Sequence, residues 1–319
     1  MKKIIYILSI TSFLFGAVSC KEEAFDQEEQ YKQVLYLMSK DSYNVWPVTY
    51  TFKEKGEVTT GYLSIGCGGS LSNPKECIID IETDTVLFDK YNKLNFDIDS
   101  AKYAKILPKD RYSIKTMSAT LPANSTDQYV KIPIDVNIDG LSPDSTYFIP
   151  LAIKKVSNYE VNPEKSNVLY KICLKNEYAD ESEGTYYQMR GNTLNDKGEV
   201  IGSISSTKSV KPLSKNSVRM FVGNKLETST STVDDIAMQS IIVTVNENKE
   251  LTIEPYGTIQ IEQFSRVDNW NTYEEVKDTY SENKIKKYFY LHYRYRTFNP
   301  AKASWSDWTI VKESMYRVE

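Results

Sequence analysis

Histidine is almost absent from this chain, which has a single one, His292, in 319 residues. One imidazole cannot build a multi-histidine metal site, and it leaves a serine or cysteine triad with only one possible base. The chain also lacks the G-x-S-x-G, P-loop and G-x-G-x-x-G fingerprints of hydrolases and nucleotide-binding proteins. Because His292 lies among tyrosines and arginines, we interpret it as a structural or surface side chain. We therefore expect no enzyme, no cofactor and no metal site.

Carboxylates are plentiful, and a glycoside hydrolase needs only two of them, about 5 to 10 Å apart. Asp80, Glu82 and Asp84 alternate along one predicted strand, and Asp97 and Asp99 follow. Alternating acids are typical of the solvent face of a strand, and the D-x-D-x-D-G spacing of a calcium loop is missing. The pattern favours a solvated face, and an unrecognised glycosidase is kept as an alternative.

Cysteine is scarce, with four in the chain, and no C-x-x-C pair is present to suggest a zinc or thioredoxin-type site. Cys67 and Cys77 flank a turn-rich stretch that could bring them together as a disulfide in an oxidising compartment. Whether that bond forms is left open. Cys173 alternates with the apolar positions of 168–174, so we predict that it is a buried free thiol on the other face of that strand.

Long apolar runs are also missing. The run from Ile4 to Phe15 follows two lysines and is shorter than the roughly 20 residues that span a bilayer, so it is typical of an export signal. Ala17 to Cys20 resembles a bacterial lipobox, which implies that residues 1–19 are a lipoprotein signal peptide and that Cys20 is acylated, for instance with palmitate. The alternative is an ordinary secretory signal with a chance cysteine.

An acid-rich stretch without apolar periodicity follows Cys20, and we expect residues 20–30 to be a disordered tether. Its beginning, Lys21, Glu22 and Glu23, resembles the export tag of surface lipoproteins in Bacteroidetes. That resemblance implies a surface-exposed protein, anchored by lipid in the cell outer membrane. A short acidic linker would look much the same.

The charge balance excludes one class of partner. The formal net charge is −4 and no basic stripe interleaved with aromatics is present, so we expect no nucleic acid partner. Residues 20–319 are too many for one typical domain of about 100 to 200 residues, and two domains are the default.

Apolar residues alternate with period two along most of the chain, which predicts strands. Residues 129–138 are the clearest case, and turn signals recur at short intervals around them. This spacing predicts an all-β protein in which 31–176 form an immunoglobulin-like antiparallel sandwich. Pro133 and Pro150 interrupt two of the strands, so we expect each at an edge or a bulge.

The acidic, aperiodic stretch 176–184 is interpreted as the linker to a second domain, residues 184–319. Strand-like runs continue to the end of the chain, which predicts an antiparallel barrel or a second sandwich. In residues 288–297, Phe289, Leu291, Tyr293 and Tyr295 share one face of the strand. Tyrosines, His292 and arginines occupy the other face.

The first half resembles the N-terminal β-sandwich domain of Bacteroidetes surface lipoproteins encoded in polysaccharide utilisation loci. The segments that carry this resemblance are Leu107–Tyr112, Thr120–Asn124 and Leu141–Leu151. The second half, from Gly184–Tyr186 to Trp308–Arg317, resembles the C-terminal domain of unknown function that often follows. The resemblance implies a setting beside a SusC/SusD-type transporter complex and a binding role, and it supplies no catalytic residues.

Binding of a sugar needs exposed aromatic rings beside polar side chains. Trp270 and Trp305 lie in polar, turn-rich stretches, so we predict that they are ligand-binding platforms. Trp308 begins a strand and is expected in the core, and Trp46 is left open as a rim residue. The chain is thus predicted to be a cell-surface lipoprotein that captures extracellular polysaccharide or oligosaccharide for uptake. The alternative is an adhesion or pilus-associated structural lipoprotein that binds a protein.

Overall fold

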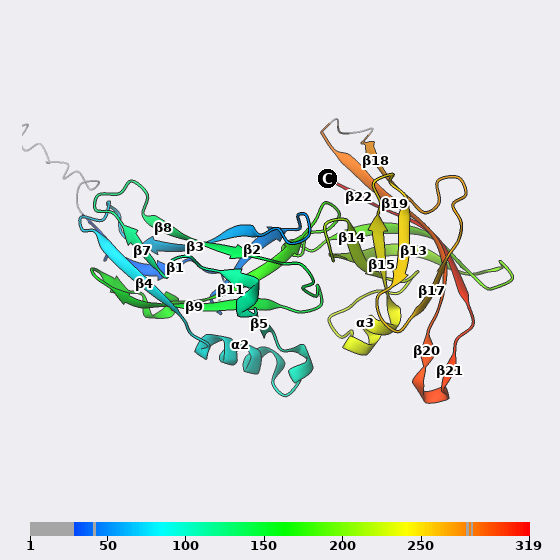
Figure 1. Ribbon diagram of the computed structural model, residues 1–319, viewed down its shortest axis with the longest axis horizontal. Coiled ribbons are helices and arrows are strands. Elements are labelled where there is room, and N and C mark those ends of the chain that lie inside the picture. Colours follow the sequence, from blue (N-terminus) through cyan, green and yellow to red (C-terminus); the bar gives the residue numbers. More distant parts are fainter. Residues whose placement is uncertain (1–28, 41–42, 279–280, 282) are drawn as a thin grey trace, which may run out of the picture.

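A computed structural model describes residues 29–40, 43–278, 281 and 283–319. The expected signal peptide, Cys20 and the expected tether up to residue 28 lie outside the described residues. Two β domains are arranged end to end along the long axis of the molecule (Figure 1). In the part of the chain that the structure describes, no helix is long and apolar enough to cross a membrane.

The N-terminal domain is a sandwich of two sheets. The first sheet has the order β10 (Glu160–Val161), β1 (Val34–Leu37), β3 (Thr59–Cys67), β8 (Tyr129–Val136) and β6 (Tyr112–Ser113). The second has the order β2 (Val45–Thr51), β11 (Asn167–Lys175), β9 (Tyr147–Val156), β4 (Cys77–Thr83) and β7 (Ser118–Leu121), with β5 (Lys105–Ile106) on β9. Alternate residues of both sheets point inward and form one apolar core, which includes Leu63, Ile132 and Ile172.

The helix α2 (Val86–Phe96) covers part of the outer side of the second sheet (Figure 1). Phe88 packs edge-on against Phe148, their ring centroids 6.4 Å apart, in a small satellite core with Leu169. Short 3-10 turns lie at Ser100–Lys102, Lys109–Arg111, Pro163–Lys165 and Pro300–Lys302.

The all-β sandwich predicted for the first domain is confirmed, with the difference that the pairs β1–β10, β2–β11 and β5–β9 are parallel. Both prolines lie where strand pairing is interrupted. Pro133 is on a stretch of β8 that β6 does not reach, since β6 pairs only with Asp135 and Val136. Pro150 lies in the gap that β4 and β5 leave between them on β9. A missing N–H is tolerated at both places.

The C-terminal domain is one strongly curled sheet of nine strands. Its order is β16 (Leu251–Pro255), β15 (Ser240–Val245), β14 (Ser217–Phe221), β13 (Val200–Pro212), β12 (Tyr186–Leu194), β22 (Thr309–Val318), β19 (Ile285–Arg296) and β17 (Gln260–Gln263), with β18 (Thr272–Lys277) also on β19. The helix α3 (Val233–Gln239) precedes β15, and a hairpin of β20 (Phe298–Asn299) and β21 (Ser304–Trp305) projects from the sheet (Figure 1). The sheet encloses a core that includes Tyr187, Val243 and Phe289.

A side chain closes the seam between the two ends of this sheet. Gln263, at the end of β17, accepts a hydrogen bond from Ile253 N at 2.8 Å and donates one to Leu251 O at 2.7 Å. Its side-chain amide thus makes the kind of hydrogen bonds with the backbone of β16 that a neighbouring strand would make. The domain is therefore a near-closed barrel, one of the two architectures that the sequence predicts.

The interior of the barrel holds one ion pair. Lys208 Nζ donates to both carboxylate oxygens of Glu313, at 2.8 and 3.0 Å, and neither side chain is more than 1% exposed. The hydroxyl of Tyr293 donates to the same carboxylate at 3.3 Å and accepts from Gly223 N at 2.9 Å. Burial raises the pKa of Glu313 against the opposing effect of Lys208.

The connection between the domains is packed rather than loose. Asn176 is buried and donates to the carbonyls of Ser214 and Ser217 at 2.7 and 2.9 Å. Tyr178 enters the barrel core, where its ring meets Tyr273 edge-on. The acidic composition of 176–184 gave no sign of these contacts.

A polar junction fixes the two domains further. Asp144, on a loop of the sandwich, accepts from Arg219, from Lys211 at 3.2 Å and from the hydroxyl of Tyr256 at 2.8 Å. Arg219 is fully buried and also binds both oxygens of Glu227, at 2.7 and 3.0 Å. A carboxylate of the first domain is therefore buried against cations of the second.

The three cysteines of the described chain are free and buried. The prediction for Cys173 is confirmed, and burial raises its pKa to about 11. Cys67 and Cys77 pack in the sandwich core from opposite sheets as thiols, so the structure contains no bond between them.

Candidate functional site

One face of the barrel carries an unusual set of side chains. Alternate residues of β19 point outward, and the strand register places those of β22, β12 and β18 beside them. We call this surface the outer face. It includes outward residues of these strands and of β17, and aromatic residues of the adjoining loops: Gln188, Arg190, Asn192, Glu262, Phe264, Trp270, Glu274, Tyr288, Tyr290, His292, Arg294, Arg296, Trp305, Trp308, Lys312, Ser314 and Tyr316.

Three tyrosines form one end of the outer face. Tyr288 stacks on Tyr290 with ring centroids 5.8 Å apart, and on Tyr316 of the neighbouring strand at 5.5 Å. Their hydroxyls meet polar partners at the rim, since Tyr316 donates to Gln188 and Tyr290 to Glu274. Burial raises the pKa of Tyr290, and the adjacent Glu274 adds to that effect. The cluster presents half-buried rings with neutral, hydrogen-bonding edges.

Trp270 and His292 form the middle of the outer face. Trp270 meets Tyr290 and His292 edge-on, at 6.3 and 6.1 Å, and Lys312 Nζ lies 4.8 Å from the centroid of its ring. On the other side of the imidazole, Phe264 stacks on His292 at 4.4 Å. Burial lowers the pKa of His292, and the charge of Lys312 lowers it further. Both effects favour the neutral form of the imidazole.

The loop that carries Trp270 is fixed by its neighbour Asn271. Asn271 is 2% exposed and has a left-handed backbone, φ 58°. Its amide donates to the carbonyls of Phe264 and His292, and it accepts from His292 N at 2.8 Å. Asparagine tolerates this conformation better than most residues because its short side chain bonds to nearby backbone. The tryptophan is thus fixed over β19.

Two arginines and two tryptophans form the far end. The guanidinium groups of Arg294 and Arg296 lie 4.6 and 4.7 Å from the ring centroid of Trp308. Arg296 also lies 5.3 Å from that of Trp305, which is 36% exposed on the β20–β21 hairpin. Phe298 supports Trp305 edge-on from the paired strand. Stacked cations and rings of this kind stabilise each other while their edges still face solvent.

The structure places both predicted platforms on the outer face but not in contact with each other. Trp270 and Trp305 come from separate loops and lie at two positions on the outer face, linked by His292 and the arginines. The expectation that Trp308 lies in the core is wrong, because it is half-buried on the outside beneath two guanidinium groups. Its place at the start of β22 suggested burial, but the inward positions of that strand are Val311, Glu313 and Met315.

Other candidates from the sequence lie elsewhere. Asp80 and Glu82 are on the outside of β4, where Glu82 pairs with Lys154 at 3.5 Å, and Asp84 bonds the first turn of α2. Trp46 packs half-buried against the sandwich core. Within the described residues, no three His, Cys, Asp or Glu side chains gather as metal ligands would.

Sequence reasoning missed most members of the outer face. The tyrosine and arginine alternation of β19 was visible, but nothing tied it to Trp270 or Trp308, which are distant in sequence. Lys312 and Tyr316 belong to another strand, and only the register of β19 with β22 places them there.

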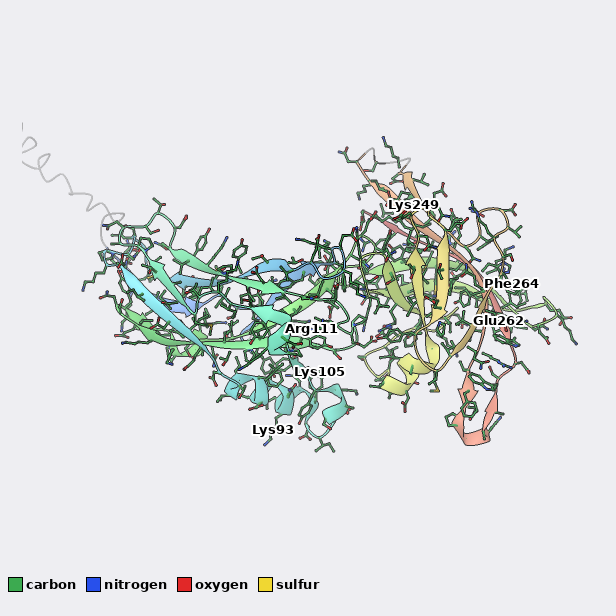
Figure 2. The ribbon with its side chains drawn as sticks, viewed as in Figure 1. Lys93, Lys105, Arg111, Lys249, Glu262 and Phe264 are labelled. Carbon is green, nitrogen blue, oxygen red and sulfur yellow. The ribbon has the colours of Figure 1, made fainter. Side chains whose placement is uncertain are left out.

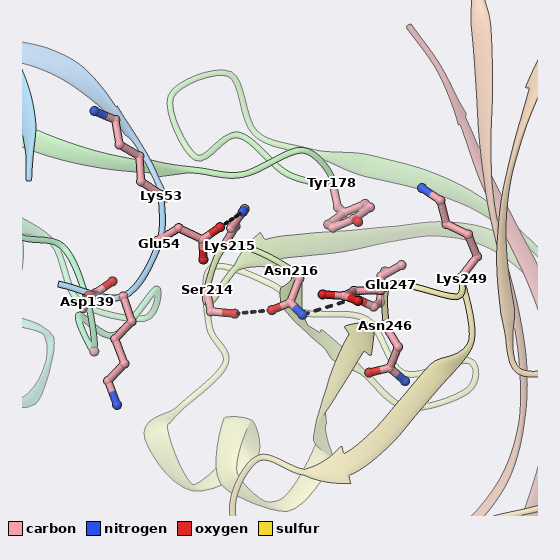
Figure 3. Close-up of a pocket in the computed structure, with 13 residues that line it drawn as sticks. Lys53, Glu54, Asp139, Tyr178, Ser214, Lys215, Asn216, Asn246, Glu247 and Lys249 are labelled. Carbon is pink, nitrogen blue, oxygen red and sulfur yellow. Dashed lines mark hydrogen bonds and ion pairs between the residues drawn. The ribbon is translucent and has the colours of Figure 1, made fainter. Parts of the chain in front are cut away.

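A cleft of about 570 Å³ lies between the domains and is a second candidate site (Figure 3). Its walls are mainly long charged side chains, and Lys215 pairs with Glu54 across it. Tyr178 is its one aromatic lining residue, and that ring is already packed in the barrel core. The cleft therefore offers no flat ring for a sugar, whereas the outer face offers several.

Family comparisons agree with this architecture. One family model, described as an N-terminal domain, matches residues 27–160, and another, described as C-terminal, matches residues 166–316. The chain has the two-domain layout of these models. No curated protein matches it in sequence.

Solved structures from Bacteroides share the fold. A Bacteroides ovatus protein of unknown function aligns with a TM-score of 0.68 and 18% identity, covering 90% of this chain and 95% of its own. A multidomain Bacteroides ovatus protein including DUF1735 aligns with a TM-score of 0.66 and 17% identity, over 89% and 94% of the two chains. An auxiliary nutrient-binding protein from Bacteroides thetaiotaomicron aligns with 0.62 and 13%, over 86% and 91%. At these identities the likeness shows the fold alone.

Proposed function

We propose that the protein binds an extracellular polysaccharide or oligosaccharide on the outer face of its barrel and does not cleave it. The observation that carries this proposal is the presence of two groups of half-exposed rings along β19, one around Tyr288 and Trp270 and the other around Trp305 and Trp308. Sugar rings present C–H faces to flat aromatic side chains, and their hydroxyls bond to amides and charged groups such as those of Gln188 and Asn192. The nutrient-binding name of one structure with this fold supports the same role.

The proposal includes a location. Residues 1–20 have the features of a lipoprotein signal, so we place the protein on the outer membrane, held by acyl chains on Cys20. A single chain binds membranes only marginally, so firm anchoring needs the several chains that lipoprotein processing adds. In this position it would pass captured glycan to a SusC/SusD-type transporter complex. Replacement Cys20→Ala should abolish labelling with a palmitate analogue and move the protein into the soluble fraction; equal labelling of the variant would refute the anchor.

The binding role is tested at the two tryptophans. After a glycan array has identified a polysaccharide, calorimetric titration should show that Trp270→Ala and Trp305→Ala each weaken binding by about 1 to 3 kcal/mol. The melting temperature should barely change, because neither ring belongs to the buried core. Tyr62→Ala is the matched control, since Tyr62 is an aromatic residue of the sandwich that is 49% exposed.

The outcomes are distinct. Wild-type affinity in both tryptophan variants would remove the binding site from the outer face. A large fall in melting temperature would instead make the tryptophans structural, since truncation of a core tryptophan costs about 3 to 5 kcal/mol.

A further inference from the structure

We infer that the ligand of the outer face is an anionic polysaccharide, one that carries carboxylate or sulfate groups. This inference rests on the proposed function and adds the charge of the ligand to it. The observation is a set of cations on the outer face with no acidic partner: Arg190, Arg296 and Lys312. Among the residues that the structure describes, no carboxylate lies within ion-pair distance of any of the three. The chain as a whole is acidic, with a net charge of −4, so this local excess is opposite in sign to the protein.

Arg190 lies on β12, at the side of the outer face, in the same row as Tyr290 of the tyrosine cluster. On β12 it is opposite Ser314 of β22, which in turn is opposite Tyr290 of β19. Its other neighbour across the sheet is Ser205 of β13. Small hydroxyl side chains flank it on both sides, so the exposed guanidinium stands beside the tyrosine cluster with room for a ligand group.

Lys312 is one row further along the same sheet, opposite Asn192 on one side and His292 on the other. Its ammonium group lies over the ring of Trp270, at 4.8 Å, and its side chain is exposed. A sugar stacked on or beside Trp270 would therefore bring its substituents close to this charge.

Arg294 and Arg296 give an internal contrast. Arg294 is neutralised by Glu262, to which its Nε donates at 2.8 Å. Arg296 donates to the neutral amide of Gln260 at 2.7 Å instead. Both stack on Trp308, but only Arg296 keeps an uncompensated charge. A guanidinium group stacked on an aromatic ring still has in-plane N–H groups, which bind carboxylate or sulfate oxygens in pairs.

The acids of the outer face do not cancel this charge. Glu262 is engaged by Arg294, and Glu274, at the rim, accepts from the hydroxyl of Tyr290 at 3.4 Å. On the strands of the outer face, three cations without an acidic partner thus stand against one acid without a cationic partner, Glu274, while the exposed Asp268 and Asp307 lie on the adjoining loops. The hydroxyls of a neutral glycan could accept hydrogen bonds from these cations, but only an anionic glycan would neutralise their charge.

The test compares polysaccharides that differ only in charge. The probes are polygalacturonate and its methyl-esterified form, for carboxylate, and dextran sulfate and dextran, for sulfate. Calorimetric titration with the wild-type protein should show that the charged member of one pair binds at least about tenfold more tightly than the neutral member. The pair that discriminates identifies the anionic group. Raising the salt concentration from about 0.05 to 0.3 M should weaken that binding by screening.

Charge-removing variants locate the effect. Arg190→Gln and Lys312→Gln should each weaken binding of the charged probe by about fivefold, the upper range for an exposed charge pair. The control is Lys93→Gln, which removes the same charge from α2 on the other domain, away from Glu262 and Phe264 on the barrel (Figure 2). All three positions are exposed, so folding should be unaffected. Trp270→Ala is measured with the same four probes.

The failures of the two proposals can be told apart. If neutral and charged probes bind equally, and Trp270→Ala weakens both while Arg190→Gln and Lys312→Gln do not, the charge inference is overturned and the binding face stands. Equal losses in Lys93→Gln would show that the attraction is not specific to the outer face, which also overturns the inference. If Trp270→Ala and Trp305→Ala leave binding of every probe unchanged, or if no probe and no array glycan binds, the proposed function fails and the inference with it.

Discussion

The outer sides of β4 and β19 show how two strands with the same alternation can differ. Both strands bury every second residue in the core of their domain: Cys77, Ile79 and Ile81 on β4, and Phe289, Leu291 and Tyr293 on β19. On the outside, β4 presents Asp80 and Glu82, beside the exposed Ile78, and none of them stacks on a ring of the described residues. β19 presents tyrosines, a histidine and arginines that stack on tryptophans from neighbouring loops.

This difference shows that the inward and outward residues of one strand have separate roles. The inward positions carry the same apolar type of residue in both domains. They determine that a strand forms and which side of it packs on the core. The outward positions contribute little to the fold. Acids there keep a surface solvated, whereas half-buried rings and unpaired cations leave it able to bind.

The largest effect on the free energy of unfolding is expected at the buried ion pair of the barrel, and an exposed ion pair of the sandwich provides the comparison. Lys208→Met should lower the free energy of unfolding by about 3 to 5 kcal/mol, because Glu313 is left as a buried charge without a partner. Lys154→Met breaks the exposed pair with Glu82 and should cost about 0 to 1 kcal/mol. Denaturant titration measures both. A cost below about 1 kcal/mol for Lys208→Met would mean that Glu313 avoids an unpaired buried charge, by protonation or by contact with water.

The junction of the two domains should weaken in acid. Burial raises the pKa of Glu227, but the hydrogen bonds and charges of Arg219 and Lys211 outweigh it, and the net pKa is lowered. A lowered carboxylate pKa contributes stability that is complete above the unfolded-state value of about 4.3 and is lost as the pH falls through the folded value. Thermal melts should therefore show a falling stability below about pH 4.5.

A substitution at the same domain junction tests these contacts at neutral pH. Asp144→Asn should cost about 1 to 3 kcal/mol at neutral pH, because it removes the sandwich's carboxylate from the buried Arg219. Small-angle scattering should show the domains less firmly oriented in this variant. Unchanged scattering and stability would assign the junction to the packed segment around Tyr178 instead.

A smaller effect is expected at the barrel seam. Gln263→Ala removes two hydrogen bonds to β16 and should cost about 1 to 2 kcal/mol. Gln188→Ala, which loses one hydrogen bond at the surface, should stay within about 0.5 kcal/mol. Hydrogen exchange of Ile253 N should quicken in the first variant alone; equal protection in both would mean that the seam does not depend on the glutamine.

The smallest effects are expected for substitutions on the outer sides of β4 and β19. Glu82→Gln should change neither stability, within about 0.5 kcal/mol, nor glycan binding. Tyr290→Ala should weaken glycan binding by about 0.5 to 1.5 kcal/mol, since its ring links the tyrosine cluster to Trp270. Loss of binding in Glu82→Gln would contradict the contrast drawn between the two strands.

Much of the fold could be predicted because it depends on local alternation. The strand at 129–138, the buried thiol of Cys173 and the inward face of β19 all follow from residues two apart. The parallel pairs could not, and two of them, β1 with β10 and β2 with β11, join segments more than a hundred residues apart. The acidic composition of residues 176–184 hid the fact that the connection between the domains is packed. Tyr178 and Ala179 are the apolar residues of this stretch that become buried.

The candidate site could be predicted only in pieces. Trp270 and Trp305 were visible as aromatic residues in polar stretches, and their common surface was not. Three separate facts bring them together: the register of β19 with β22, the left-handed turn at Asn271 and the hairpin that carries Trp305. The wrong prediction that Trp308 lies in the core has the same origin. Alternation shows which residues share a face of a strand, but the inward face is known only once the strand's first paired residue is known.

The way the described chain begins has a mechanical consequence. Glu29, ahead of β1, accepts hydrogen bonds from Ser70 N and Leu71 N in the loop after β3, which lower its pKa to about 2. From there β1 runs between β3 and β10. In the proposed arrangement, tension between a glycan held at the barrel and the membrane would pull along the strands of the sandwich. Such a load shears many hydrogen bonds at once instead of peeling them one by one, so the sandwich would serve as a stiff arm that resists the pull of a long polymer.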